Sequence, residues 1–255
     1  MAVPLYERLF KIHCHNCYHT LYLTGNINSY GTNCPDTNDC EVKLMRPSKN
    51  FLSLCLMTTL ISFLGFLTEN IWLSITKGYM NNRNMYFPFL LGYGLAVLLF
   101  YALFGTPQKP KFLHLPLEFS RPLYAVLYYM FMVALCIGIG ETLIGNIVEH
   151  TCGFEWWNYT WLPYNIGKYT SLPTSFAFSS FITLFMRFCF NPLHEFFCSL
   201  NYNILWVTAL FFMLLMVGDF IHSGYLMFKN KTILVKWQIN TSGTILYQLL
   251  HSKPI

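Results

Sequence analysis

Residues 51–68 read FLSLCLMTTLISFLGFLT, a run of apolar and small polar residues without one charged side chain. The run continues past Glu69 to about residue 76, which exceeds the roughly 20 residues that a helix needs to cross a bilayer. Its residues do not alternate between polar and apolar, as they would in a strand of a membrane barrel. Because a single strand would leave backbone amides and carbonyls unpaired in lipid, the run predicts a transmembrane helix.

Four further apolar runs follow the first. They cover residues 86–106, 122–152, 172–186 and 203–228. Of the 255 residues, 55% are hydrophobic and only 11% are charged, whereas soluble domains carry about 25% charged residues. We therefore predict an all-α, polytopic membrane protein with about five transmembrane helices, embedded in the lipid bilayer.

Polar residues set the limits of this membrane domain. We expect a polar, Cys/His-containing N-terminal extension in residues 1–50, the five-helix domain in residues 51–228 and a short polar tail in residues 229–255. Prolines predict that two connections are loops. They are Pro107, Pro110, Pro116 and Pro122 in the second connection, and Asn191-Pro192 in the fourth.

The charge pattern and the motifs exclude several classes of function. The 16 Lys+Arg residues exceed the 11 Asp+Glu residues without forming a basic stripe, so nucleic acid is not an expected partner. Gly167-Lys168-Tyr169-Thr170 lacks the earlier glycine of a phosphate-binding loop, and the chain shows no other nucleotide-binding motif. The expected partners are lipid and other membrane subunits, and no cofactor is indicated.

Four cysteines lie in the polar N-terminal segment: Cys14, Cys17, Cys34 and Cys40. A C-x-x-C pair followed by two further cysteines is able to hold zinc, although the second pair is spaced more widely than is usual. In an oxidising compartment the same thiols would form disulfides instead. Metal ligands, disulfides and free thiols all stay open as the state of these cysteines.

Three acidic residues stand out inside the predicted spans, where an ionisable group is costly and by default marks a functional site. They are Glu69, Glu141 and Asp219, in the first, third and fifth spans. Odd-numbered spans run in the same direction, and at 1.5 Å per residue each acid lies roughly 24–27 Å along its helix. We therefore expect all three carboxylates close to the same membrane face.

Small residues share a helix face with each acid. The stripes are Ala134, Gly138, Glu141, Gly145 and Glu149 in the third span, Ser62, Gly65 and Glu69 in the first, and Asp219, His222 and Ser223 in the fifth. Because small residues let another backbone approach closely, the stripes predict that Glu141 points into the bundle. Loops at the same face supply Arg83 and Lys168 as cations and Trp156-Trp157 as stacked indoles.

These residues allow three interpretations. In a substrate- or ion-binding site, negative charge would come from Glu69, Glu141 and Asp219, the counter-ion from Arg83, secondary polar groups from Glu149 and His222, and a lid or anchor from Trp156 and Trp157. Alternatively, the carboxylates brace the helices by pairing with Arg83 or Lys168. Catalysis would use the paired acids, or Asp219 with His222, as acid and base, but the sequence offers no nucleophile for it.

Several motifs resemble those of one family. They are Glu141-Thr-Leu-Ile-Gly145-Asn-Ile-Val-Glu149, Trp156-Trp157-Asn158-Tyr159-Thr160, Tyr164-Asn165-Ile166 and Gly65-Phe66-Leu67-Thr68-Glu69. They resemble the family called putative ABC-transporter permease, CmpB type, and animal transmembrane protein 229 looks like a relative. The resemblance extends over about residues 62–223 and implies five membrane helices in an integral, multi-pass membrane protein. Phe66, Asn84 and Asn158 stand where the family pattern has Trp, Gly and Asp.

From these observations we predict a permease-like or solute- or ion-binding membrane component with an acidic pocket at one membrane face. The alternative is a non-transporting scaffold or lipid-organising protein whose intramembrane acids are structural braces. Enzymatic activity is the less favoured class, because no catalytic motif accompanies the acids.

Overall fold

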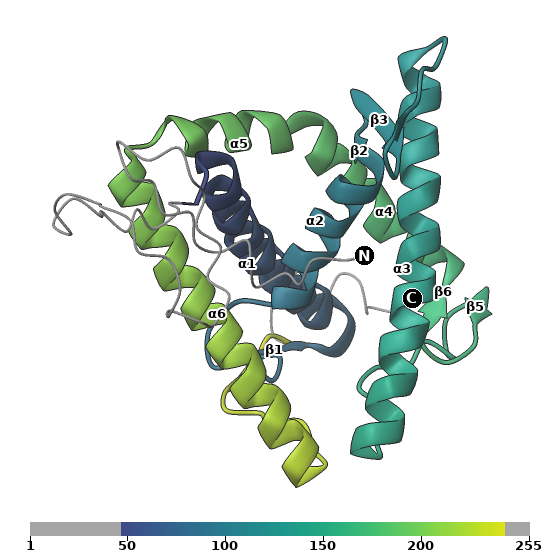
Figure 1. Cartoon of the computed structure of the whole chain (residues 1–255). Coiled ribbons are helices and arrows are strands. Elements are labelled where there is room, and N and C mark those ends of the chain that lie inside the picture. Colours follow the sequence, from purple (N-terminus) through teal and green to yellow (C-terminus); the bar gives the residue numbers. More distant parts are fainter. Residues whose placement is uncertain (1–46, 243–255) are drawn as a thin grey trace, which may run out of the picture. The chain divides into compact units, whose positions relative to one another are not determined.

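The computed structural model describes residues 47–242, which form six helices and seven short strands (Figure 1). The helices are α1 (Lys49–Lys77), α2 (Leu91–Phe104), α3 (Pro122–Cys152), α4 (Leu172–Phe188), α5 (Phe190–Ser199) and α6 (Tyr202–Asn230). The strands are β1 (Tyr79–Asn81), β2 (Gly105–Thr106), β3 (Lys109–Phe112), β4 (Leu115–Pro116), β5 (Asn165–Ile166), β6 (Thr170–Ser171) and β7 (Gln238–Asn240). The predicted helical class is confirmed.

Three helices, α1, α3 and α6, are each long and apolar enough to cross a membrane. α4 and α5 pass the same test only together, and they meet at a bend of 48°. With this bent pair counted as one span, residues 47–242 hold up to four candidate spans. The five spans predicted from the sequence are therefore an approximate number.

α2 is shorter than the second span that the sequence predicts. It begins at Leu91 and has 14 residues, which is about 21 Å of helix. The stretch before it is apolar, but the backbone N–H groups of Tyr86 and Phe87 donate to the carboxylate of Asp219 at 2.9–3.0 Å. These bonds hold the stretch as a loop, so the helix starts later than its hydrophobicity indicates.

The prediction that Asn191-Pro192 lies in a loop is wrong. Both residues belong to the first turn of α5. A proline removes no helical hydrogen bond there, because the first N–H groups of a helix have no partner within it. The chain instead breaks at Cys189, between α4 and α5.

The second connection is extended, as its prolines predict, and its segments pair with one another. β2, β3 and β4 form a three-stranded antiparallel sheet in which Gly105 pairs with Pro110 and Lys111 with Pro116. Gly105 has a φ of +71°, and an added Cβ would lie 2.5 Å from the carbonyl oxygen of Lys109. Glycine is therefore the residue that fits this turn.

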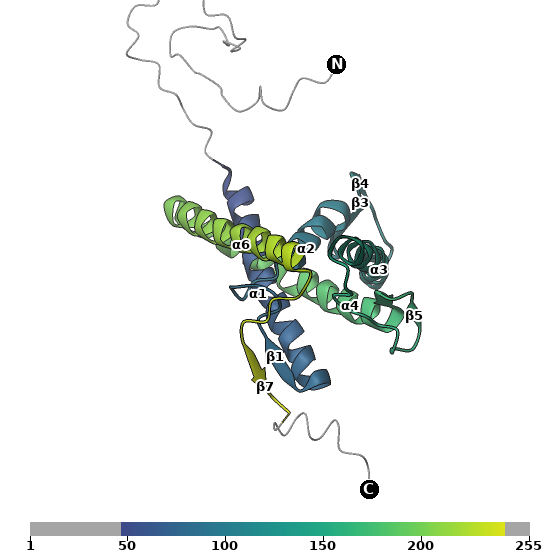
Figure 2. The same ribbon diagram turned by 90° about the horizontal axis from the view of Figure 1, so that it is seen from below.

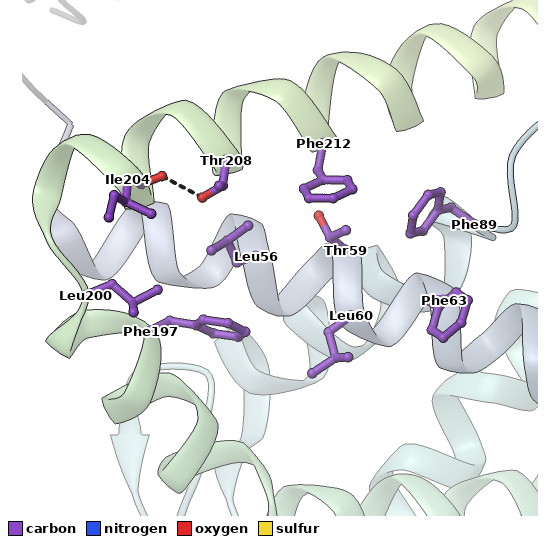
Figure 3. Close-up of a pocket in the computed structure, with 10 residues that line it drawn as sticks. All are labelled: Leu56, Thr59, Leu60, Phe63, Phe89, Phe197, Leu200, Ile204, Thr208 and Phe212. Atoms are coloured by element: carbon purple, nitrogen blue, oxygen red, sulfur yellow. Dashed lines mark hydrogen bonds between the residues drawn. The ribbon is translucent and has the colours of Figure 1, made fainter.

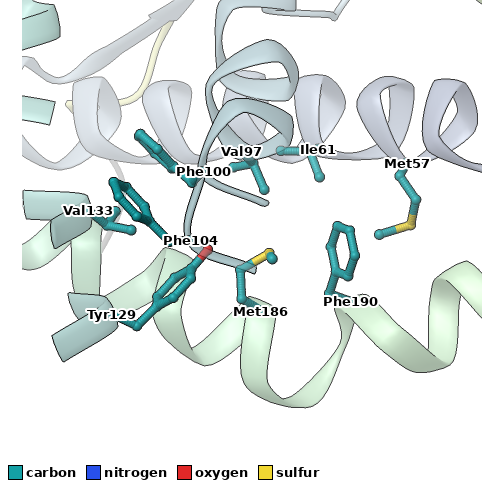
Figure 4. Close-up of a cluster of buried hydrophobic side chains, with 9 residues drawn as sticks. All are labelled: Met57, Ile61, Val97, Phe100, Phe104, Tyr129, Val133, Met186 and Phe190. Atoms are coloured by element: carbon teal, nitrogen blue, oxygen red, sulfur yellow. The ribbon is translucent and has the colours of Figure 1, made fainter. Parts of the chain in front are cut away.

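The largest buried apolar cluster lies where α1 to α4 meet at the start of α5 (Figure 4). It consists of Met57, Ile61, Val97, Phe100, Phe104, Tyr129, Val133, Met186 and Phe190. A second cluster joins α1 to α6 and consists of Leu52, Leu56, Leu205 and Ala209. Because lipid is as apolar as these side chains, close packing rather than exclusion of water stabilises such contacts in a membrane.

The segment after α6 returns to the loop after α1. β7 pairs with β1 in an antiparallel register that sets Met80 opposite Ile239 (Figure 2). Asn82 donates to the carbonyl of Leu234 at 2.9 Å and accepts from the backbone N–H of Lys236 at 3.0 Å. Residues 234–240, which lie in the predicted polar tail, thus fix the loop that follows α1.

Candidate functional site

Glu69, near the end of α1, has both a cationic and a hydroxyl partner. Its Oε2 lies 2.6 Å from the guanidinium of Arg83, and its Oε1 accepts a hydrogen bond of 2.5 Å from the hydroxyl of Tyr93 in α2. The side chains of Arg83 and Glu69 are 23% and 22% exposed. Arg83 has a φ of +50°, and its backbone N–H donates to Oδ1 of Asn81 at 3.0 Å. This turn positions the guanidinium of Arg83 beside the carboxylate of Glu69.

Gly65 makes room for the hydroxyl partner of Glu69. A Cβ added at Gly65 would lie 2.5 Å from Cγ of the Tyr93 ring, which is closer than van der Waals contact allows. Gly65 precedes Glu69 by four residues, so both lie on one face of α1. The stripe of small residues that contains Gly65 predicts the close approach of another backbone. In the structure a side chain, the Tyr93 ring, lies there instead.

Glu149, near the end of α3, is held in the same way. It accepts hydrogen bonds from Nζ of Lys168 at 2.7 Å and from the hydroxyl of Tyr169 at 2.5 Å. A Cβ added at Gly145, four residues earlier, would overlap the Tyr169 ring. The side chains of Lys168 and Glu149 are 47% and 35% exposed, so this group is more open to solvent than the one around Glu69.

The loop between α3 and β5 contacts Lys168 and Tyr169, the two partners of Glu149. Lys168 lies 3.0 Å from Glu155, and Asn158 donates to Glu155 at 2.6 Å. The hydrogen bond from Asn158, followed by that from Lys168, lowers the pKa of Glu155 below its ordinary value. Trp157 donates from its indole N–H to the carbonyl of Tyr169 at 2.9 Å. Its ring thus supports the tyrosine that binds Glu149.

Glu141 differs from both of these acids, because one oxygen of its carboxylate lacks a partner. Its Oε2 is buried and has no hydrogen-bond partner within residues 47–242. The Thr170 side chain interacts with the same carboxyl group. One turn earlier, a Cβ at Gly138 would lie 3.7 Å from the hydroxyl oxygens of Thr170 and Ser175. Glu141 therefore faces β6 and the start of α4.

Tyr159 links Glu141 to the Glu69 group. Burial raises the pKa of the Tyr159 hydroxyl above its ordinary value, and the charges of Glu141 and Glu69 raise it further, while Arg83 opposes them. These effects place the hydroxyl within electrostatic reach of both acids and of Arg83. At neutral pH it is a protonated hydroxyl, able to donate a hydrogen bond.

Asp219, the third acid, is occupied by backbone amides. Besides the N–H groups of Tyr86 and Phe87, its carboxylate accepts a hydrogen bond of 3.0 Å from the Ser223 hydroxyl. The ring centroid of His222 lies 5.3 Å from that of Tyr86. Asp219 thus holds the loop before α2 against α6, and its oxygens have partners that Glu141 lacks.

The structure sorts the predicted site residues into three groups. Glu69 of α1, Arg83 of the loop after β1 and Glu141 of α3 lie within electrostatic reach of one another. Glu149 and Trp157 both contact Tyr169, and the ring of Trp156 lies against that of Trp157. Asp219 and His222 lie at the loop before α2.

Sequence reasoning missed the tyrosines that bind the acids. Tyr93 and Tyr169 lie far from Glu69 and Glu149 in the sequence, so spacing does not reveal these bonds. The available signal is a glycine four residues before each glutamate, which indicates that something bulky packs there. Which residue fills the space follows only from the fold.

The described residues offer no metal centre. No group of three or more His, Cys, Asp or Glu side chains between residues 47 and 242 could hold a metal ion. The cysteines predicted as candidate ligands, Cys14, Cys17, Cys34 and Cys40, lie outside the described residues.

The region that contains these acids matches a model of a known protein family. A family model described as Putative ABC-transporter type IV matches residues 56–224. Neither a curated protein nor a solved structure matches the chain. The match covers both acid–tyrosine groups, Glu141 and Asp219, and together with the candidate spans it identifies an integral, multi-pass membrane protein.

Proposed function

Because the chain belongs to the Putative ABC-transporter type IV family, we propose that it is a permease-like membrane component with an acidic site at one membrane face. The site consists of Glu141 together with Glu69, Arg83 and Tyr159. Its ligand is a small cation, a proton or an amine-bearing solute. Glu149 and Trp157 support the adjoining loop.

One observation carries this proposal: the buried, unpartnered Oε2 of Glu141. A carboxylate in a low-dielectric setting is strongly unfavourable unless it is paired or protonated. The other acids nearby have partners, since Glu69 binds Arg83 and Glu149 binds Lys168. Glu141 is therefore the acid whose charge a cationic ligand or a proton would neutralise.

Arg83 supplies a second open group beside the same acids. Its guanidinium pairs with Glu69, but its Nε is buried and has no hydrogen-bond partner within the described part of the chain. A solute that carries both an amine and an acceptor atom would satisfy Glu141 and Arg83 together. The hydroxyl of Tyr159 would be a third contact.

The proposal is tested by uptake into proteoliposomes that contain the purified full-length chain. The probes are radiolabelled methylammonium and, for protons, a trapped pH-sensitive dye. We expect flux above that of empty liposomes, and we expect Glu141→Gln to lower it about tenfold or more, as loss of one charged contact would. Glu195→Gln, an exposed acid of α5 at the opposite end of the helices, is the matched control. Flux equal to that of empty liposomes for both probes would refute the proposal.

A second candidate function rests on the paired acids. Glu69, Glu149 and Asp219 each join separate elements of the chain, as they would in a membrane scaffold or lipid-organising protein. A stoichiometric membrane partner that co-purifies with the chain, without transport or ligand-dependent stabilisation, would favour that function.

A further inference from the structure

A groove of about 390 Å³, lined by no acidic residue, runs between α1, α5 and α6 (Figure 3). Leu56, Thr59 and Phe63 line it from α1, and Ile204, Thr208 and Phe212 line it from α6. Its volume lies within the range of about 300–1,000 Å³ that is typical of small-molecule sites.

The walls of the groove offer apolar contacts only. Its two threonines direct their hydroxyl groups to their own helices: Thr59 donates to the carbonyl of Cys55 at 3.2 Å, and Thr208 donates to that of Ile204 at 2.7 Å. The other lining residues are leucine, isoleucine and phenylalanine. An occupant without hydrogen-bonding groups fits such walls.

Aromatic rings close one end of the groove. The Phe89 ring lies 6.1 Å from the Phe63 ring and 6.1 Å from the Phe212 ring, measured between centroids. These rings come from α1, the loop before α2 and α6, and they lie together at one end in Figure 3. An elongated occupant would end against them.

The opposite end of the groove carries positive charge. Lys49, the first residue of α1, donates from Nζ to the carbonyls of Cys198 and Leu200 at 3.2 and 3.0 Å, and Leu200 lines the groove. An ammonium group has three donors, so one is left for an anion. α1 and α6 both begin at this end, where helix dipoles favour negative charge.

We propose that the groove binds one acyl chain of an anionic phospholipid, whose phosphate lies at Lys49. The chain of methylenes lies between α1 and α6 and ends at the phenylalanine rings. Five cations lie in segments at this membrane face: Lys49, Lys109, Lys111, Arg121 and Arg187. Among the described residues in these segments, the acidic ones are Glu118 and Glu195. The positive charge is therefore in excess at this face and attracts anionic lipid. This site is independent of the function proposed for Glu141.

The test is native mass spectrometry of the full chain. The protein is extracted in mild detergent from bilayers of equimolar dioleoylphosphatidylglycerol and dioleoylphosphatidylcholine. We expect one retained phospholipid per chain, mainly the phosphatidylglycerol. Thr208→Phe fills the groove and should lower the ratio of lipid-bound to lipid-free chain about tenfold, which corresponds to a loss of about 1.4 kcal/mol. Val207→Phe, on an exposed face of the same helix, is the matched control and should retain the lipid.

A variant that removes the charge of Lys49 tests the binding of the phosphate separately from the binding of the acyl chain. Lys49→Gln keeps a donor for the α5 carbonyls but loses the charge, so it should still retain lipid while the preference for phosphatidylglycerol disappears. Leu60→Phe, a second filling variant, replaces Thr208→Phe if the thermal unfolding temperature shows that the latter is misfolded. Equal retention by filling and control variants, no preference in the wild type, or a dimer without lipid would each overturn the proposal.

Discussion

The chain builds the same acid–tyrosine arrangement twice, once between α1 and α2 and once between α3 and α4. In each, a glutamate follows a glycine by four residues, a tyrosine ring packs on the glycine and its hydroxyl donates to the glutamate. A cation from the intervening loop completes each group, Arg83 in the first and Lys168 in the second. The recurrence indicates an arrangement that joins a long helix to the segment that follows it, which includes α2 in the first group and the connection before α4 in the second.

The two groups differ in burial and in what lies beside them. Arg83 is 23% exposed, whereas Lys168 is 47% exposed and shares its charge between Glu149 and Glu155. Glu141, with its unpartnered oxygen, interacts electrostatically with Glu69. The arrangement by itself is therefore structural. In the proposed function the difference between the two groups comes from Glu141, which adds an acid without an ion-pair partner beside Glu69.

The largest expected effect is on the partly buried ion pair of Glu69 and Arg83. Glu69→Gln leaves Arg83 without its counter-ion; breaking a fully buried pair costs about 3–5 kcal/mol of unfolding free energy, which is the upper bound for this pair. Glu149→Gln should cost clearly less, because water solvates Lys168 and Glu155 still binds it. Unfolding titrations in mixed detergent micelles measure both. Equal losses would show that burial does not distinguish the two groups.

The next effect is on the two glycines under the tyrosine rings. Gly65→Ala and Gly145→Ala each push a methyl group into a ring, and such overpacking costs about 1–3 kcal/mol. Gly140 of α3 has nothing within 4 Å of an added Cβ, so Gly140→Ala should leave stability unchanged or raise it by about 0.5–1 kcal/mol. The same unfolding titrations measure the stability of all three variants. If all three variants behave alike, the glycines do not serve the tyrosines.

A smaller effect is expected from the tyrosine hydroxyls. Tyr93→Phe removes a hydrogen bond to a largely buried carboxylate and should cost about 0.5–1.5 kcal/mol. Tyr169→Phe should cost less, because water can reach Glu149 in its place. A greater loss for Tyr169→Phe in the unfolding titration would reverse the ranking of the two groups.

The last effect is a pH dependence that appears only in the alkaline range. Burial, and then the hydrogen bond to Glu149, raise the pKa of Tyr169 to about 12, above the ordinary value of about 10. The folded state thus favours the protonated hydroxyl, and its contribution is complete below pH 10 and lost as the pH rises through 12. Stability should fall over this range, and less in Tyr169→Phe. An unchanged slope in that variant would exclude Tyr169 as the cause.

The sequence predicted the helices better than their connections. Long uncharged runs predict α1, α3 and α6, because crossing a bilayer requires about 20 apolar residues in helical form. Hydrophobicity could not predict the late start of α2, which depends on Asp219 binding amides more than 130 residues earlier in the chain. Pro192 was misassigned because proline is compatible with a loop and with the first turn of a helix.

The candidate site was predictable in its charges and not in its partners. An acidic residue within a long apolar run can be recognised in the sequence. Glu69, Glu141 and Asp219 could therefore be predicted as candidate site residues. Whether each acid is paired depends on tertiary contacts such as those of Tyr93 and Tyr86. Only the fold distinguishes Glu141, whose Oε2 has no partner within the described residues, from Glu69 and Asp219, whose carboxylates have partners.

The most direct test of this account is the stability of Glu141→Gln beside that of Glu69→Gln, as purified full-length proteins in one detergent. If Glu141 serves a ligand rather than the fold, removing its charge should leave the thermal unfolding temperature unchanged or raise it, because the variant no longer buries a charge that has no ion-pair partner. Glu69→Gln should lower the temperature in the same experiment. A loss of stability in Glu141→Gln as large as that in Glu69→Gln would contradict the account and make all of these acids braces.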